Sequence, residues 1–350
     1  MQNKPHFETL DGLRGIAAIA VVIFHFMEIA VPTPNNNFIA HAYLAVDFFF
    51  CLSGFVIAYA YDDKMKSIGI ATFLKRRLIR LHPLVIVGSV LGLLTFLFDP
   101  FSDLHLNYAK KIGLMFICSC LMIPLPLVKE RYFNLFHLNP PTWSLFWEYI
   151  ANIFYAIVLV KLPKKVLWVL TALAAIALVY EAVQSKHLSV GWGGDNIRGG
   201  GIRVSFSFLA GIMIYRSGWI IRSKLGFASL SLLMLPAFLF PFSETFNWFA
   251  DPFVVIFYFP VIIMLGAGAL RHKTTQAVCR FSGKISYPLY MVHYPFIWIF
   301  YSYIEKYKPS IGTMAWMTAI GTVLLLLLAY VVMKFVDEPV RKWLSKRKTA

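Results

Sequence analysis

Long apolar stretches separated by short polar loops run through the whole chain. About 20 consecutive apolar residues suffice for a helix to cross a bilayer, and stretches near that length recur from one end to the other. The pattern therefore predicts an all-α, polytopic membrane helical bundle. Eleven apolar segments can be drawn: 12–30, 39–61, 81–98, 111–128, 144–160, 165–183, 202–215, 225–241, 252–270, 285–304 and 313–336.

The composition supports a membrane protein. Of 350 residues, 59% are hydrophobic and 14% are charged, so we expect one integral membrane domain over 1–350, with the first segment retained and not removed as a signal peptide. The net charge of +16 lies in short loops, where it favours contact with lipid headgroups, and no nucleic-acid partner is expected. The four cysteines lack metal-ligand spacing, so they are interpreted as packing residues and no metal is expected.

The segment 111–128 decides the topology. It contains Pro124 and Pro126, which a re-entrant piece buried by protein tolerates better than a spanning helix. If this segment does not span, most of the 33 Lys and Arg residues fall on one side; if it spans, the split is nearly even. Cytoplasmic loops are rich in Lys and Arg. We therefore predict about ten transmembrane helices plus one re-entrant or interfacial segment, with both termini cytoplasmic.

The first apolar segment carries Arg14 and His25. The eleven steps between them turn a helix through three full circles plus about 20°, so both side chains share one face, roughly 16 Å apart along the axis. Ionisable groups in a spanning segment are a functional hypothesis by default. The alternative is that Arg14 reaches the headgroups while His25 only hydrogen-bonds a neighbouring helix.

A basic run, TFLKRRLIRLHPL, precedes the third predicted span. It contains Arg76, Arg77 and Arg80, and residues three apart share a helical face. Guanidinium groups bind phosphate oxygens in bidentate fashion, so a phosphorylated cytosolic donor such as a nucleotide or coenzyme A is a natural ligand. The alternative is ordinary charge that orients the chain in the membrane.

A carboxylate lies inside the span that begins with PTWSLFWEYIANIFYA. Glu148 follows Ser144 by four residues, so Ser144 could cap the helix while Glu148 faces the same side. A carboxylate at that depth needs a partner, which Arg14 or His25 could supply. Glu148 is therefore a candidate catalytic residue, or else one half of a structural ion pair.

Two further carboxylates could orient the imidazole of His25. Asp47 is the second residue of VDFFFCLSGFVI, and Glu28 lies three residues after His25. Glu28 could hold the ring or end the span in headgroup water. Ser53 lies in the same stretch as Asp47, but it lacks the GxSxG pattern of a nucleophile elbow, so a serine acyl-enzyme is not favoured.

Aromatic residues recur in GKISYPLYMVHYPF near the C-terminus. Tyr287, Tyr290 and His293 lie on related helical faces. Aromatic side chains are common at membrane interfaces, so we interpret these residues as packing residues.

Together these stretches resemble the type 3 membrane-bound acyltransferase family, which includes O-antigen and exopolysaccharide O-acetyltransferases. The resemblance rests on LDGLRGIAAIAVVIFHF, VDFFFCLSGFVI, RRLIRLHP, WSLFWEYIANIFY, ISYPLYMVHYPF and DEPVRK, in that order. It implies about ten spans, a cytosolic acyl-CoA donor such as acetyl-CoA, and a hydroxyl acceptor on a glycan, a lipid-linked sugar or a small natural product. The chain departs from the family pattern at His82, where an aromatic residue often stands, and it lacks the hydrolase-like domain fused to some members.

The resemblance carries the family's essential histidine onto His25, its paired arginine onto Arg14 and its intramembrane glutamate onto Glu148. Imidazole is suited to remove a proton from a hydroxyl that attacks a thioester. We therefore predict a membrane O-acyltransferase with His25 as general base, oriented by Glu148 or Asp47. Direct transfer and an acyl-histidine relay both stay open.

The family's basic donor motif falls on Arg77 and Arg80, and with Arg76 these side chains are predicted to bind the phosphates of acyl-CoA. A bacterial plasma membrane is the expected location. Oligomeric state is left open.

The main alternative from another class is a proton-coupled transporter that uses Arg14, His25 and Glu148 as a site within the bundle. A purely structural scaffold is a third interpretation, and it leaves the buried charges unexplained.

Overall fold

The computed structural model describes residues 6–270 and 272–346. Over these ranges the chain is helical and has no β-strand, with one isolated bridge between Asn134 and Gly193. The α-helices are α1 (Glu8–Ala30), α2 (Ala45–Tyr61), α3 (Met65–Leu97), α4 (Leu104–Asn107), α5 (Ile112–Leu121), α6 (Thr142–Ile157), α7 (Lys164–Ser185), α8 (Ile197–Ser217), α9 (Phe227–Met234), α10 (Pro236–Leu239), α11 (Asn247–Phe253), α12 (Phe259–Ala267), α13 (Lys273–Val292), α14 (Tyr294–Tyr307), α15 (Ile311–Val332) and α16 (Glu338–Lys346). Short π-helical turns join α11 to α12 (Val254–Tyr258) and α15 to α16 (Met333–Asp337).

Eight helices of the described chain are long and apolar enough to cross a membrane: Glu8–Ala30, Ala40–Tyr61, Met65–Leu97, Thr142–Lys161, Lys164–Ser185, Ile197–Ser217, Asn247–Ala267 and Ile311–Lys346. The predicted all-α membrane bundle is thereby confirmed, and the protein is an integral membrane protein. Two predicted spans differ from expectation. Segment 225–241 is divided between α9 and α10, and segment 285–304 is broken at His293 between α13 and α14. The predicted number of about ten spans stays a prediction.

Segment 111–128 forms a short helix followed by an irregular chain. Helix α5 has 10 residues and ends at Leu121, and the next residue, Met122, has a left-handed φ of 53°. Ten residues extend about 15 Å, half of the roughly 30 Å hydrocarbon core. The two prolines that follow cannot continue the helix. This geometry agrees with a re-entrant or interfacial segment. Lys4, Arg271, Arg347 and Lys348, which the topology prediction counts as cytoplasmic, lie outside the described residues, as do both predicted cytoplasmic termini.

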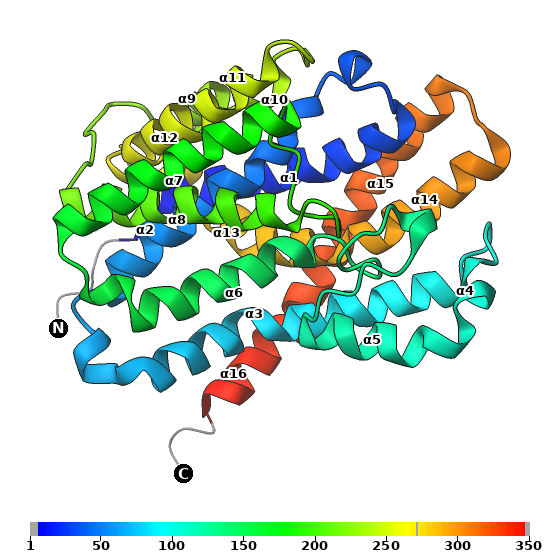
Figure 1. Ribbon diagram of the computed structural model, residues 1–350, viewed down its shortest axis with the longest axis horizontal. Coiled ribbons are helices and arrows are strands. Elements are labelled where there is room, and N and C mark those ends of the chain that lie inside the picture. The colour runs from blue at the N-terminus through cyan, green and yellow to red at the C-terminus, as the bar shows by residue number, and fades with distance from the viewer. Residues whose placement is uncertain (1–5, 271, 347–350) are drawn as a thin grey trace.

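Helix α1 occupies the centre of the bundle. It contacts α2, α9, α12, α13, α14 and α15 (Figure 1). Leu13, Ala17 and Val22 are fully buried. Helices α7 and α15, by contrast, expose large apolar side chains such as Ile176 and Leu324, as expected of lipid-facing surfaces. The residues that α1 carries are therefore surrounded by protein.

Helices α2 and α8 approach each other closely enough that only glycine fits at the contact. A Cβ atom at Gly54 would lie 2.1 Å from the carbonyl oxygen of Phe208, and one at Gly211 would lie 1.9 Å from that of Cys51. Small residues that let backbones approach in this way are typical of membrane helix interfaces. This contact fixes α2, which lines both cavities described below.

We expect Gly54→Ala to destabilise the protein by about 1–3 kcal/mol, because the new methyl group overlaps backbone that cannot move aside independently. Gly113→Ala in α5 is the matched control, because a Cβ atom there meets nothing within 4 Å. Thermal unfolding of the purified protein in detergent measures the difference. Equal unfolding temperatures for the two variants would refute the close contact.

Candidate active site

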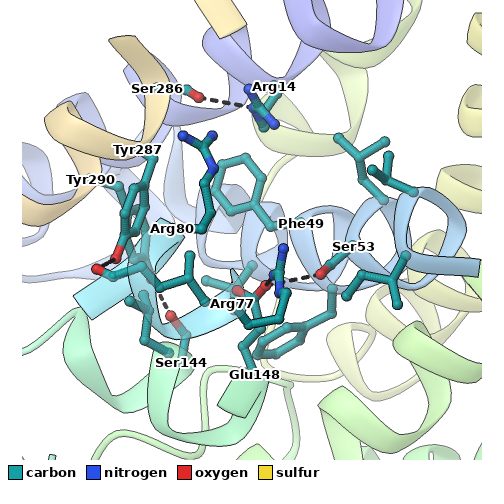
Figure 2. Close-up of a pocket in the computed structure, with 17 residues that line it drawn as sticks. Arg14, Phe49, Ser53, Arg77, Arg80, Ser144, Glu148, Ser286, Tyr287 and Tyr290 are labelled. Atoms are coloured by element: carbon teal, nitrogen blue, oxygen red, sulfur yellow. Dashed lines mark hydrogen bonds and ion pairs between the residues drawn. The ribbon is translucent and has the colours of Figure 1, made fainter. Parts of the chain in front are cut away.

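The first of two cavities is named here the arginine cavity. It has a volume of about 150 Å³ and lies between α1, α2, α3, α6 and α13. Figure 2 shows Arg14, Arg77 and Arg80 in it, with Glu148 opposite Ser53. Its lining comprises Arg14, Val46, Phe49, Phe50, Leu52, Ser53, Val56, Ile57, Arg77, Arg80, Leu81, Ser144, Leu145, Glu148, Ser286, Tyr287 and Tyr290.

Arg14 is held by α13. Its Nε donates to Ser286 Oγ at 3.0 Å and its Nη2 donates to the carbonyl oxygen of Gly283. Asp11, one turn earlier, lies 3.2 Å from the same guanidinium. The two helices can approach this closely because Gly283 has no side chain: a Cβ atom there would lie 2.5 Å from Asp11 Cβ. Arg14 is therefore a cation held in position by α13 and by Asp11.

Glu148 is paired with the basic run. Its Oε1 accepts from Arg77 Nη2 at 2.7 Å and from Ser53 Oγ at 2.9 Å. The predicted pairing of Glu148 with Arg14 or His25 is not what the structure shows, because Arg77 of α3 lies closer. Ser144 does not cap α6, which begins at Thr142 without a side-chain cap. The Ser144 hydroxyl donates instead to the carbonyl oxygen of Pro141 at 3.0 Å.

The three cations of the basic run differ in position. Arg77 and Arg80 line the cavity, whereas Arg76 is exposed and is not among its lining residues. Figure 2 draws no hydrogen bond or ion pair from Arg80 to the other residues of the cavity. With Arg14, the cavity lining holds three guanidinium groups, and the carboxylates that pair with them are two, Glu148 in the lining and Asp11 behind Arg14. The remaining positive charge suits the cavity to an anion.

The second cavity, named here the histidine cavity, has a volume of about 450 Å³. Its wall is rich in aromatic rings and in residues from the loops 31–37, 132–141 and 186–196. The lining residues are Val21, Phe24, His25, Glu28, Ile29, Val31, Pro32, Pro34, Asn37, Ala40, Tyr43, Val46, Tyr132, Asn134, Pro140, Pro141, Trp143, His187, Ser189, Trp192, Arg203, Phe242, Tyr290, Tyr294 and Trp298.

His25 is oriented by Glu28. Its Nδ1 lies 2.5 Å from Glu28 Oε1, and the Tyr294 hydroxyl donates to the same oxygen at 3.4 Å. A carboxylate partner makes Nδ1 the protonated nitrogen of the neutral ring and leaves Nε2 as the acceptor. The ring of His293, fully buried at the break between α13 and α14, stacks on His25 at a centroid distance of 5.3 Å. Three neighbours therefore fix the imidazole.

Asp47, predicted to orient His25, is paired elsewhere. Its Oδ2 accepts from Arg203 Nη2 at 2.6 Å and from Arg203 Nε at 3.1 Å. Arg203 also donates to the carbonyl oxygens of Val190 and Tyr43, each at 2.9 Å. Both charged side chains are almost fully buried, at 0% and 1% exposure. Neither Asp47 nor Glu148 orients the imidazole, because each neutralises a nearer guanidinium.

One further histidine lines the histidine cavity. His187 lies in the loop after α7. Burial lowers its pKa below the usual value, and the positive charge of Arg203 lowers it further. His187 is therefore neutral at neutral pH and adds no charge to this cavity. Among the residues that the structure describes, no group of three His, Cys, Asp or Glu side chains could hold a metal ion.

Sequence reasoning did not single out Arg203 and treated His293 as packing. Arg203 is an ionisable residue within the predicted span 202–215, so the criterion that found Glu148 applies to it equally. Glu28 lies three residues after His25, and this spacing allowed its contact with the His25 ring to be named as one of two interpretations. The stacking of His293 on His25 joins segments 268 positions apart and has no signal in a single sequence.

Fold and site together define a helical integral membrane protein in which one central helix carries a cation into one cavity and an imidazole into another. The family profile described as "Acyltransferase domain" matches residues 7–334. The chain belongs to this acyltransferase family, as the resemblance predicted. Family membership favours acyl transfer over the transporter alternative.

Two relatives illustrate the similarity. The chain is 35% identical to "Protein 2 in picA locus" of Rhizobium radiobacter over 198 residues, which cover 52% of this chain and 98% of the relative. It is 24% identical to the O-acetyltransferase OatA of Staphylococcus aureus (strain NCTC 8325 / PS 47) over 371 residues, which cover 98% of this chain and 58% of the relative. The chain thus spans little more than half the length of OatA. Comparison with solved structures finds no match.

We expect Asp47→Asn to destabilise the protein by about 3–5 kcal/mol, because it leaves the buried Arg203 guanidinium without its counter-charge. The double variant Asp47→Leu/Arg203→Met removes both charges and is expected to unfold at a higher temperature than Asp47→Asn. Thermal unfolding in detergent measures both. If the double variant does not unfold at a higher temperature than Asp47→Asn, the instability of Asp47→Asn does not come from an uncompensated charge.

Proposed function

We propose that the protein transfers an acyl group, in the simplest case acetyl, from acyl-CoA to a hydroxyl group of a glycan, a lipid-linked sugar or a related acceptor. The donor binds at the arginine cavity and the acceptor at the histidine cavity. The observation that carries the proposal is the placement of Arg14 and His25, on the single helix α1, in two cavities that share part of their lining. Membership of the acyltransferase family supports the reaction class.

The arginine cavity has the charge that a CoA donor requires. Arg80 has no partner drawn in the cavity, and Arg77 is neutralised only by Glu148. Phosphate oxygens accept bidentate hydrogen bonds from guanidinium groups. Arg77 and Arg80 bind the phosphates in this scheme, while Arg14 lies deeper along the path of the pantetheine arm. Arg76, predicted to share this role, is exposed and is not among the lining residues, so it has no direct contact with the phosphates in this scheme. In the predicted topology this end faces the cytosol of a bacterial cell, where acyl-CoA is made.

His25 is the general base of the proposed reaction. Its Nε2 takes the proton of the acceptor hydroxyl while the oxygen forms a bond to the thioester carbonyl carbon. The carbon–sulfur bond then breaks, and the departing thiolate takes the proton from His25 to give free coenzyme A. Glu28 stabilises the imidazolium that forms in between and keeps Nδ1 protonated. Glu28, one of the candidates beside Glu148 and Asp47, is thus the orienting carboxylate in this scheme.

The direct test is release of free coenzyme A. Purified protein in detergent, supplied with acetyl-CoA and a glycan acceptor, is expected to release thiol, which a chromogenic thiol reagent measures. His25→Ala should lower turnover by about 10²- to 10⁴-fold, the usual contribution of a positioned base.

The matched control is His105→Ala in α4, outside both cavities, which should retain turnover. Glu28→Gln keeps the shape of the side chain but not its charge, and it should also lower turnover. A folded His25→Ala protein with the turnover of the wild type would remove the base assignment.

Arg80→Ala is expected to raise the Michaelis constant for acetyl-CoA by about tenfold to a hundredfold, because hydrogen bonds to a charged group contribute about 1.5–3 kcal/mol. The Michaelis constant for the acceptor should change little. Arg76→Ala removes the same charge from the same helix but outside the cavity, so it should have a much smaller effect. Equal effects of the two substitutions, or a larger effect on the acceptor, would contradict donor binding in the arginine cavity.

A further inference from the structure

Two side chains form the wall between the cavities. Val46 of α2 and Tyr290 of α13 are the residues that the two linings have in common. Both are nearly buried, with 6% and 7% of their surfaces exposed. A single layer of side chains therefore separates the arginine cavity from the histidine cavity, and any group that passes from one to the other meets these two residues.

Tyr290 is held in place at this wall. The Tyr290 hydroxyl shares a hydrogen bond of 2.8 Å with the Ser144 hydroxyl, in which either group can donate. Ser144 Oγ also lies 3.0 Å from the carbonyl oxygen of Pro141. Phe49 meets the Tyr290 ring edge-on at a centroid distance of 5.8 Å. Figure 2 shows this hydroxyl pair at the edge of the arginine cavity. Turning the ring aside requires breaking the hydrogen bond.

The wall lies close to the proposed base. The Tyr290 ring is 5.9 Å from the ring of His293, which in turn stacks on His25 at 5.3 Å. On the other side, Arg14 and Arg80 line the arginine cavity together with Val46 and Tyr290. A thioester whose phosphates are bound at the arginines can therefore reach an acceptor near His25 only by placing its acyl end at this wall.

We propose that Val46 and Tyr290 form the passage for the acyl group and limit its length, an inference that rests on the proposed function. The hydrogen bond to Ser144 holds the Tyr290 ring in place. The two methyl groups of Val46, the smaller side chain, therefore determine the width of the passage. Close-packed protein accommodates each added methylene poorly. Short acyl groups such as acetyl pass, and longer ones are excluded.

The test compares acetyl-CoA with butanoyl-CoA. Val46→Ala removes two methyl groups from the wall and is expected to raise the ratio of kcat/KM for butanoyl-CoA to that for acetyl-CoA by about tenfold or more. Val22→Ala is the matched control, because it makes the same substitution at a fully buried position of α1 that lines neither cavity. This control should keep the ratio of the wild type.

Val46→Leu provides a second measurement, because this substitution creates no cavity in the core. The larger side chain narrows the passage, so kcat for acetyl transfer should fall while the KM for acetyl-CoA stays near that of the wild type, because the arginines still bind the phosphates. A merely structural role of Val46 would change neither the chain-length ratio nor this balance between kcat and KM.

The outcomes separate the passage from the proposed function. If the wild type transfers acetyl but Val46→Ala keeps its chain-length ratio, the passage is overturned and the function stands. If Val46→Ala does not fold, Val46→Leu decides, and an unchanged kcat overturns the passage. If the wild type releases no coenzyme A from either thioester, the proposed function fails and the passage fails with it.

Discussion

The buried pair of Asp47 and Arg203 is the interaction on which the interior of the bundle depends. It joins α2 to α8 where glycines let the two backbones touch, and Arg203 also holds the carbonyl oxygens of Tyr43 and Val190. Two charges without water are stable only when paired and fully hydrogen-bonded. This pair fixes α2, and α2 supplies Val46 to the wall between the cavities. The geometry of both cavities follows from it.

The same requirement explains how the other charges are distributed. Glu148 accepts from Arg77, and the His25 imidazole takes the nearest carboxylate on its own helix, Glu28. Charged groups inside a membrane protein pair with what is closest because an unpaired charge there is strongly unfavourable. Arg14 is likewise paired with Asp11. After this pairing the guanidinium groups of the arginine cavity still outnumber their carboxylate partners, and Arg80 supplies the excess. That excess is what distinguishes a binding site for an anion from a structural ion pair.

The sequence allowed the membrane bundle, the place of Arg14 and His25 on one helix, and the grouping of Arg77 with Arg80 to be predicted, because all three depend on local spacing and hydropathy. The partners could not be predicted, because they depend on which helices touch. Arg14 meets Ser286, 272 positions away, and nothing local indicates that contact. Glu28 is the exception, because it lies three residues from His25 on the same helix, and its contact with the ring was one of the interpretations that the local spacing allowed.

Helix α1 explains why two cavities are compatible with one reaction. The eleven residues between Arg14 and His25 correspond to about 16 Å of helix, too far for both side chains to act on one carbonyl group. The structure resolves this by placing each side chain in its own cavity and leaving only Val46 and Tyr290 between the cavities. In the proposed reaction, a thin wall lets an extended thioester present its carbonyl near His25 while its phosphates stay at the arginines. In that reaction, the spacing along α1 corresponds to the length of donor arm that the protein has to accommodate.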